Sequence, residues 1–207
     1  MEEADRVLEY WFASPGDEEY GTFREMWYHG GPEIDAEIIE RFGKLYERAA
    51  AGELDHWPDR ARSCLALILV FDQFPRNMFR GTPRSFATDP KAVELARHAV
   101  EQGYDRSLEF NTQQFYYMPF EHSEDIADQR RSVELFRAGT DGAHKEANIG
   151  FAVQHLEIIE RFGRFPHRNT IVERESTPEE IKFLEDGGEK VQFGTQRNQE
   201  PEDASSG

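Results

Sequence analysis

The sequence predicts an all-α protein, and three observations support this fold class. Apolar residues recur at helical spacing in several segments, as Ile34, Ile38, Phe42 and Leu45 do. Proline and glycine stand where helices are expected to start and stop. Almost no segment has the alternating pattern of a strand. Five or more antiparallel helices with short connections are therefore expected to form one domain over residues 1–188.

The first two of these helices precede residue 72. Residues 33–51 carry one apolar stripe, and Gly52 is expected to end that helix. Pro58 suits the first helical position before residues 59–71. The apolar second half of that segment is typical of a buried helix, because the whole segment exceeds the length of an ordinary strand.

Three longer helices are predicted after residue 88. Asp89 is expected to cap a helix that ends at Gly103, and Ser123 to cap the next one. The third occupies about residues 143–162. The side chains expected to face inward are Val93, Ala96 and Val100 in the first, Ile126, Val133 and Phe136 in the second, and Ala147, Phe151, His155, Ile158 and Phe162 in the third.

The end of the chain contains one more helix signal. Thr177 followed by Pro178 and Glu180 matches a capping box, and glycines close that short helix at residues 187–188. Residues 189–207 are polar and offer little to bury, so this tail is predicted to be disordered.

Composition limits the class of partner. The chain has 207 residues and a net charge of −17, which argues against binding of nucleic acid or an anionic membrane. The acidic start lacks the basic and apolar regions of a signal peptide, and the longest apolar run is too short to span a membrane. With one cysteine, Cys64, an internal disulfide framework is excluded. We expect a cytoplasmic protein.

One phrase occurs twice, at residues 71–77 (FDQFPRN) and residues 162–169 (FGRFPHRN). Each copy follows an apolar helical segment with Phe-Pro and then presents Arg beside Asn. Because the residue before proline is disfavoured in a helix, both helices are expected to end there. Both segments are also locally basic, so that they are suited to attracting a small anion.

Three segments together resemble a known family. They are residues 72–84 (DQFPRNMFRGTPR), 119–125 (PFEHSED) and 161–169 (RFGRFPHRN). These phrases are similar to the signatures of a bacterial family catalogued as domain of unknown function 924, and the similarity covers roughly residues 4–188. The resemblance implies a compact helical fold like that of tetratricopeptide-repeat proteins. It implies no activity and assigns no catalytic residue.

The arginines of the repeated phrase allow two interpretations. Arg76 and Arg168 can stabilise helix ends, where a cation is favoured, while Asn77 and Asn169 satisfy loop carbonyls. Alternatively, the two guanidinium groups converge on one carboxylate or phosphate, which each can grip with two hydrogen bonds. Repetition alone does not decide between them.

Glu121 and His122 lie just before the helix expected at Ser123, where backbone N–H groups are unpaired. They either line a polar pocket or pair with arginines such as Arg76 or Arg168. His155, on an apolar stripe, is more typical of a core histidine than of a catalytic base.

His167 is expected to face a cavity, and Cys64 to be buried and unreactive. No histidine spacing matches a metal motif, so neither a metal nor another cofactor is predicted.

We therefore predict one polar site that binds a small anionic molecule or a peptide. A hydrolase or transferase acting on an anionic substrate, with Glu121 or a histidine as base, and a purely structural polar network are the alternatives. Oligomeric state cannot be inferred. The residues assigned to the site are Arg76, Asn77, Arg80, Glu121, His122, His155, Arg164, His167, Arg168 and Asn169.

Overall fold

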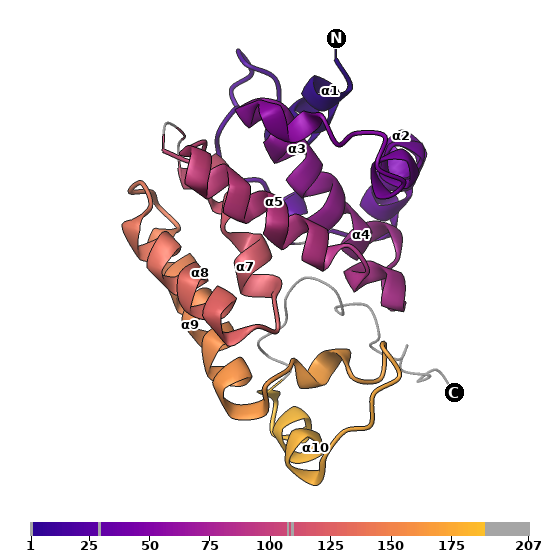
Figure 1. Ribbon diagram of the computed structural model, residues 1–207, viewed down its shortest axis with the longest axis vertical. Coiled ribbons are helices and arrows are strands. Elements are labelled where there is room, and N and C mark those ends of the chain that lie inside the picture. Colours follow the sequence, from indigo (N-terminus) through magenta and orange to yellow (C-terminus); the bar gives the residue numbers. More distant parts are fainter. Residues whose placement is uncertain (1, 29, 107, 109, 189–207) are drawn as a thin grey trace, which may run out of the picture.

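The protein was analysed as a computed structural model that describes residues 2–28, 30–106, 108 and 110–188. The described part is helical, and the predicted all-α class is confirmed (Figure 1). The α-helices are α1 (Glu3–Phe12), α2 (Pro32–Ala50), α3 (Ala61–Asp72), α4 (Phe74–Met78), α5 (Asp89–Gln102), α6 (Phe110–Gln113), α7 (Met118–His122), α8 (Ile126–Ala138), α9 (Lys145–Phe162) and α10 (Pro178–Glu185). Five 3-10 turns connect them, namely η1 (Glu25–Trp27), η2 (Trp57–Asp59), η3 (Pro83–Phe86), η4 (Gln114–Tyr116) and η5 (Pro166–Arg168).

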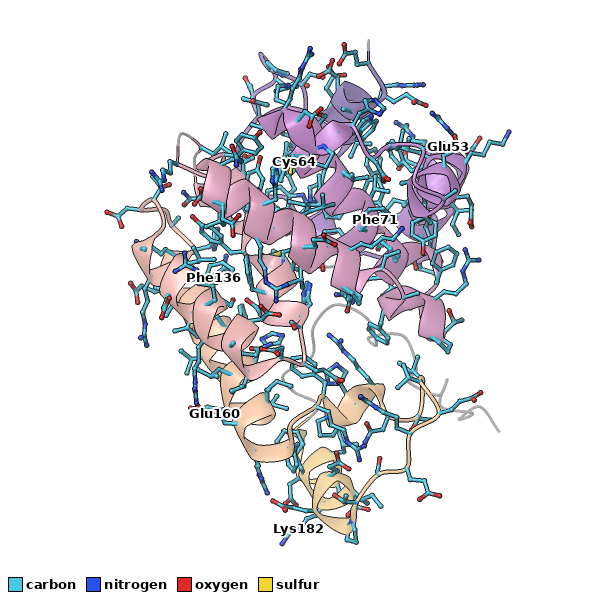
Figure 2. All side chains as sticks on the ribbon, viewed as in Figure 1. Glu53, Cys64, Phe71, Phe136, Glu160 and Lys182 are labelled. Carbon is cyan, nitrogen blue, oxygen red and sulfur yellow. The ribbon has the colours of Figure 1, made fainter. Side chains whose placement is uncertain are left out.

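Helix α3 forms the centre of the larger part of the molecule. It packs against α1, α2 and α5, and every residue from Cys64 to Asp72 is buried. A helix that is apolar on all sides can only be accommodated inside a core, which is why neighbours surround this one. Figure 2 shows Cys64, Phe71 and Phe136 among the helices and Glu160 and Lys182 at the periphery. Burial raises the pKa of Cys64 to about 12, so this thiol is unreactive, as predicted.

Helices α8 and α9 pack side by side, and the segment after α9 lies beyond the main core (Figure 1). A small apolar cluster of Ile158, Ile159 and Phe165 anchors this segment. The capping box of α10 forms as predicted, with Thr177 and Glu180 bonding reciprocally to each other's backbone N–H. The tetratricopeptide-like pairing of hairpins stays a prediction. Residues 189–207, predicted to be disordered, lie outside the described residues.

Several predicted helix starts are wrong in detail. Pro58 lies in η2, and α3 begins only at Ala61. The cap of α8 is Asp125, whose carboxylate accepts from two backbone N–H groups, and not Ser123. Asp89 makes no cap hydrogen bond, because Thr88 holds the cap position of α5 and the Asp89 carboxylate is used elsewhere.

The inward face of α9 is also different from the predicted stripe. His155 and Ile158 are buried, whereas Phe151 is 44% exposed and Ala147 is exposed. Asn148 and Ala152 occupy the buried face instead. The sequence pattern failed here because polar Asn148 is buried through a hydrogen bond to Gln114 (2.6 Å), which an apolar count cannot detect.

Among the described residues, none of the helices is both long enough and apolar enough to cross a membrane.

Candidate functional site

The two copies of the repeated phrase each begin a short helical turn. Helix α3 ends at Asp72 and helix α9 at Phe162, and proline then occupies a first-turn position in α4 and in η5. Proline fits there because its missing N–H would have no helical partner. The prediction that both long helices end at these phrases is confirmed, but the arginines stand on new turns and not in loops.

These turns bring the two arginines together on one carboxylate. Arg76 donates from Nη2 to Oδ1 of Asp89 (3.0 Å), and Arg168 donates from Nη1 to Oδ2 of the same side chain (3.3 Å). Asp89 and Arg168 are both buried, so each charge is stabilised mainly by the other groups of the cluster. The two arginines thus converge on a carboxylate of the protein itself, and convergence on the carboxylate or phosphate of a ligand stays a prediction.

The same two guanidinium groups also contact one phenyl ring. The Cζ atoms of Arg76 and Arg168 are 5.6 and 4.5 Å from the centroid of Phe86, within the range of a cation–π contact. The Nε atoms of both arginines are buried and have no hydrogen-bond partner among the described residues. Two N–H donors of this site are thus left unsatisfied, which costs free energy.

His122 completes the cluster through Asp72, a side chain only 1% exposed. Its Nδ1 lies 2.7 Å from Oδ1 of Asp72 and must carry the proton, because an ionised carboxylate only accepts. Asp72 also accepts from Arg76 (3.2 Å) and Gln73 (2.6 Å). Burial opposes ionisation of Asp72, but its interactions with His122 and Arg76 outweigh burial and lower its pKa.

Nε2 of His122 is the accessible position of this cluster. It makes no hydrogen bond within the described part of the chain and is not among the fully buried atoms that lack a partner. Burial and the charge of Arg76 lower the pKa of His122, against Asp72 and Asp89, so the ring is neutral near pH 7. The arrangement is a histidine held by a carboxylate with a bare second nitrogen, as in many general bases.

Glu121, the preceding residue of α7, has the opposite protonation. Burial, reinforced by the charge of Asp72, raises the pKa of Glu121 to about 8, so that it carries a proton at neutral pH. Its Oε1 lies 3.2 Å from Nδ1 of His155, which also donates to the carbonyl oxygen of Phe151 (2.8 Å). Burial lowers the pKa of His155 well below its ordinary value, so His155 is a neutral core histidine. Within the described part of the chain, neither Glu121 nor the His122 ring forms an ion pair with an arginine.

The ionised groups of the cluster balance one another. Asp72 and Asp89 are negative, Arg76 and Arg168 are positive, and His122 is neutral at pH 7. Burial lowers the pKa of Arg168 to about 10, which still leaves it charged. The site therefore has no net charge near pH 7, although it presents two cationic groups at one edge.

The remaining predicted site residues lie around this cluster or away from it. Arg80 forms a two-bond ion pair with Asp35 of α2, and Arg164 forms one with Glu180 of α10. Asn77 donates to the carbonyl oxygen of Gln73. These contacts fix the fold around the cluster.

The last two predicted residues flank Arg168. His167 is partly buried, and burial together with Arg168 lowers the pKa of His167 to about 3. Asn169 is buried and donates to Ser176 Oγ (3.1 Å).

Helix α7 differs from the expected setting of Glu121 and His122. The two residues form the last turn of α7, and three residues separate His122 from the start of α8 at Ile126. The backbone carbonyl of His122 accepts from Nη2 of Arg168 (3.0 Å), so a helix C-terminus meets a cation here.

A separate pocket of about 500 Å³ lies between α1, η1 and α2. Its charged lining residues are four acids and two arginines, namely Glu9, Asp17, Glu19, Glu37, Arg24 and Arg41, and no predicted site residue lines it.

Sequence reasoning missed Asp72, Asp89 and Phe86. Asp72 had a signal, because an acid directly follows the apolar run of α3 and must find partners if that helix is buried. Asp89 was taken for a helix cap on a pattern that usually means one. Phe86 had no signal, because its role depends on two arginines that only the fold brings together.

The family of the chain is shown by a comparison with protein-family models. The model of the bacterial proteins of unknown function DUF924 matches residues 7–188. A protein of unknown function from Agrobacterium tumefaciens has a similar structure, with 40% identity, a TM-score of 0.77, and coverage of 89% of this chain and 97% of that one. No curated protein matches. The chain belongs to the DUF924 family.

Proposed function

We propose that this protein binds a small anion, a carboxylate or a phosphate, at the edge of the cluster where Arg76, Arg168 and His122 meet. The observation that carries the proposal is the convergence of two arginines from distant turns on one carboxylate and one ring. Asp89 marks the type of group that this arginine pair recognises.

The charge of the whole protein supports a small ligand over a polymer. A net charge of −17 repels nucleic acid across most of the surface, while the locally cationic edge attracts a single anionic group. A peptide would be held by its C-terminal carboxylate alone, so the same chemistry covers the peptide that the sequence suggested.

Calorimetric titration of carboxylates, phosphates and short peptides into the protein tests this proposal. A direct measurement is needed because sulfate and phosphate stabilise most proteins by exclusion from the surface, which shifts a melting temperature without binding. Arg168→Lys keeps the positive charge beside Asp89 but removes the planar fork, so binding should be weakened at least tenfold. Arg161→Lys, at an exposed position near the end of α9, is the matched control and should bind as the wild type does.

Two results would refute anion binding. One is the absence of saturable heat with every ligand class at millimolar concentration. The other is equal affinity in the wild type and Arg168→Lys, because the anion would then bind elsewhere.

Acid–base catalysis on the bound anion is the second candidate function. One observation favours it: at neutral pH Glu121 carries a proton while His122, the next residue, has a bare Nε2 backed by Asp72. A pair of groups with opposite protonation is what proton transfer in both directions requires. If a substrate is found, kcat should fall at least a hundredfold in His122→Gln, while Arg161→Lys should be unaffected. Unchanged turnover in His122→Gln would exclude this role.

A further inference from the structure

We propose that an anion binds at this site together with one proton, which His122 takes up from solvent on Nε2. This inference rests on the proposed function and adds how the site meets the charge of its ligand. The ligand class is then any small anion of fixed charge, and the protein supplies the neutralising proton.

The charge balance of the cluster is the first step. Two buried carboxylates already match two buried arginines, since Arg76 contacts both Asp72 and Asp89 and Arg168 contacts Asp89. An added anion would leave an uncompensated charge in a site that water barely reaches, and such a charge is expensive. Either the anion is excluded or another group becomes positive.

His122 is placed to become that group. Its Nδ1 already donates to Asp72 (2.7 Å), which stabilises the imidazolium form as soon as Nε2 is protonated. Among the described residues the ring of His122 makes its hydrogen bond through Nδ1 alone, so a new proton on Nε2 can be donated to the ligand. Arg168, held to the backbone carbonyl of His122 at 3.0 Å, keeps the cationic edge beside the same residue.

The groups that surround His122 determine whether a bound anion raises or lowers its pKa. Without ligand, burial and Arg76 keep the ring neutral, and the bound anion would oppose both influences. Glu121 is already protonated below about pH 8 and cannot take up a proton in that range. The titratable and charged groups facing His122 are Asp72 of α3, Arg76 of α4, Asp89 of α5, Glu121 of α7, His155 of α9, and His167 and Arg168 of η5, while Asp128 of α8 is engaged by Arg97 and Ser123.

Proton uptake has a direct measurement. Sodium sulfate and sodium formate are titrated into the full chain at about pH 6.5 in two buffers with small and large heats of ionisation, because both anions keep a fixed charge there. The difference in heat between the buffers should correspond to about one proton per anion. Between the pKa of His122 in the free protein and its higher pKa in the complex, the affinity should fall about tenfold per pH unit.

Two variants identify the residue that takes up the proton. His122→Gln keeps a donor near the position of Nε2 but cannot be charged, so its binding should show no uptake and little pH dependence. Glu121→Gln should keep the uptake at pH 6.5. If His122→Gln does not fold, the two-buffer comparison on the wild type still shows whether anion binding is coupled to proton uptake.

The outcomes separate the two proposals. Binding of sulfate or formate with equal heats in both buffers overturns proton coupling and leaves anion binding standing. Uptake that persists in folded His122→Gln overturns the role of His122. If neither anion binds, both proposals fall.

Discussion

The two copies of the repeated phrase reach the same carboxylate by different routes. In the first, Asp72 is followed four residues later by Arg76, and the two form an ion pair within their own segment (3.2 Å). In the second, Gly163 stands where the first has Asp72, and His167 adds one residue before Arg168. Arg168 therefore has no acid of its own and pairs with Asp89, 79 residues away. The two similar segments therefore differ in their contacts: the first makes a local ion pair, and the second makes a long-range one.

The glycine explains how the second copy can do this. Gly163 has φ +68°, a left-handed conformation that ends α9 and turns the chain toward η5. In the first copy α4 follows α3 after the single residue Gln73. The lesson is that a repeated motif fixes side-chain chemistry, whereas the residue at the helix end decides where that chemistry points.

The largest effect is expected where both copies meet. Asp89→Ala leaves two buried arginines short of one carboxylate, so the free energy of unfolding should fall by about 3–5 kcal/mol. Denaturant unfolding measures this. Glu94→Ala, at an exposed position of the same helix, should stay within about 0.5 kcal/mol of the wild type. Equal stability of the two variants would mean that the arginines do not depend on Asp89.

The next largest effect on stability is expected at Glu121, the buried carboxyl group of α7. Because the pKa of Glu121 is raised to about 8 when folded, the folded state holds a proton that the unfolded state has lost above about pH 4.3. Stability should therefore decrease as pH rises from there to about 8, by up to about 1.4 kcal/mol per unit from this group. Glu121→Gln should remove that decrease and exceed the wild type in stability at pH 8.

Denaturant unfolding across this pH range provides the test, with Glu157→Gln, on the exposed side of α9, as the control. A parallel pH dependence in the wild type and Glu121→Gln would show that Glu121 is ionised in the folded protein.

A smaller effect separates the two routes directly. Gly163→Ala forces a side chain into a left-handed conformation and should cost about 1–2 kcal/mol. Gly150→Ala, within α9 and with open space around the new methyl group, should be neutral or stabilise by up to about 1 kcal/mol. If thermal unfolding shows the same change for both, the second copy does not need its glycine.

The helices could be predicted from the sequence more completely than the polar cluster. Helical periodicity and capping patterns are local, so α2, α3 and the capping box at Thr177 were predictable. The polar cluster is not local: Asp89 matched a cap signature but pairs with arginines from two other elements. His122 could be predicted as a site residue because the helix cap expected at Ser123 does not account for an imidazole beside a carboxylate. Its partner Asp72 was missed because it stands at the end of an apolar run.

The smallest effect concerns the outer support of the second copy. Thr177→Ala removes the hydroxyl that accepts from the Glu180 backbone, and it should cost about 1 kcal/mol. Thr170→Ala is the exposed control. A thermal scan that shows no difference between them would mean that α10 contributes nothing to holding Arg164 and its phrase.

The central claim is that the two copies hold His122 neutral, with its proton on Nδ1 and Nε2 bare. Nitrogen NMR of the histidine side chains across a pH titration tests this directly, with His122→Gln used to assign the signal. We predict the Nδ1–H tautomer at neutral pH and a pKa below 6.5. A proton on Nε2 of the neutral ring, or an imidazolium that persists above pH 7, would contradict the account.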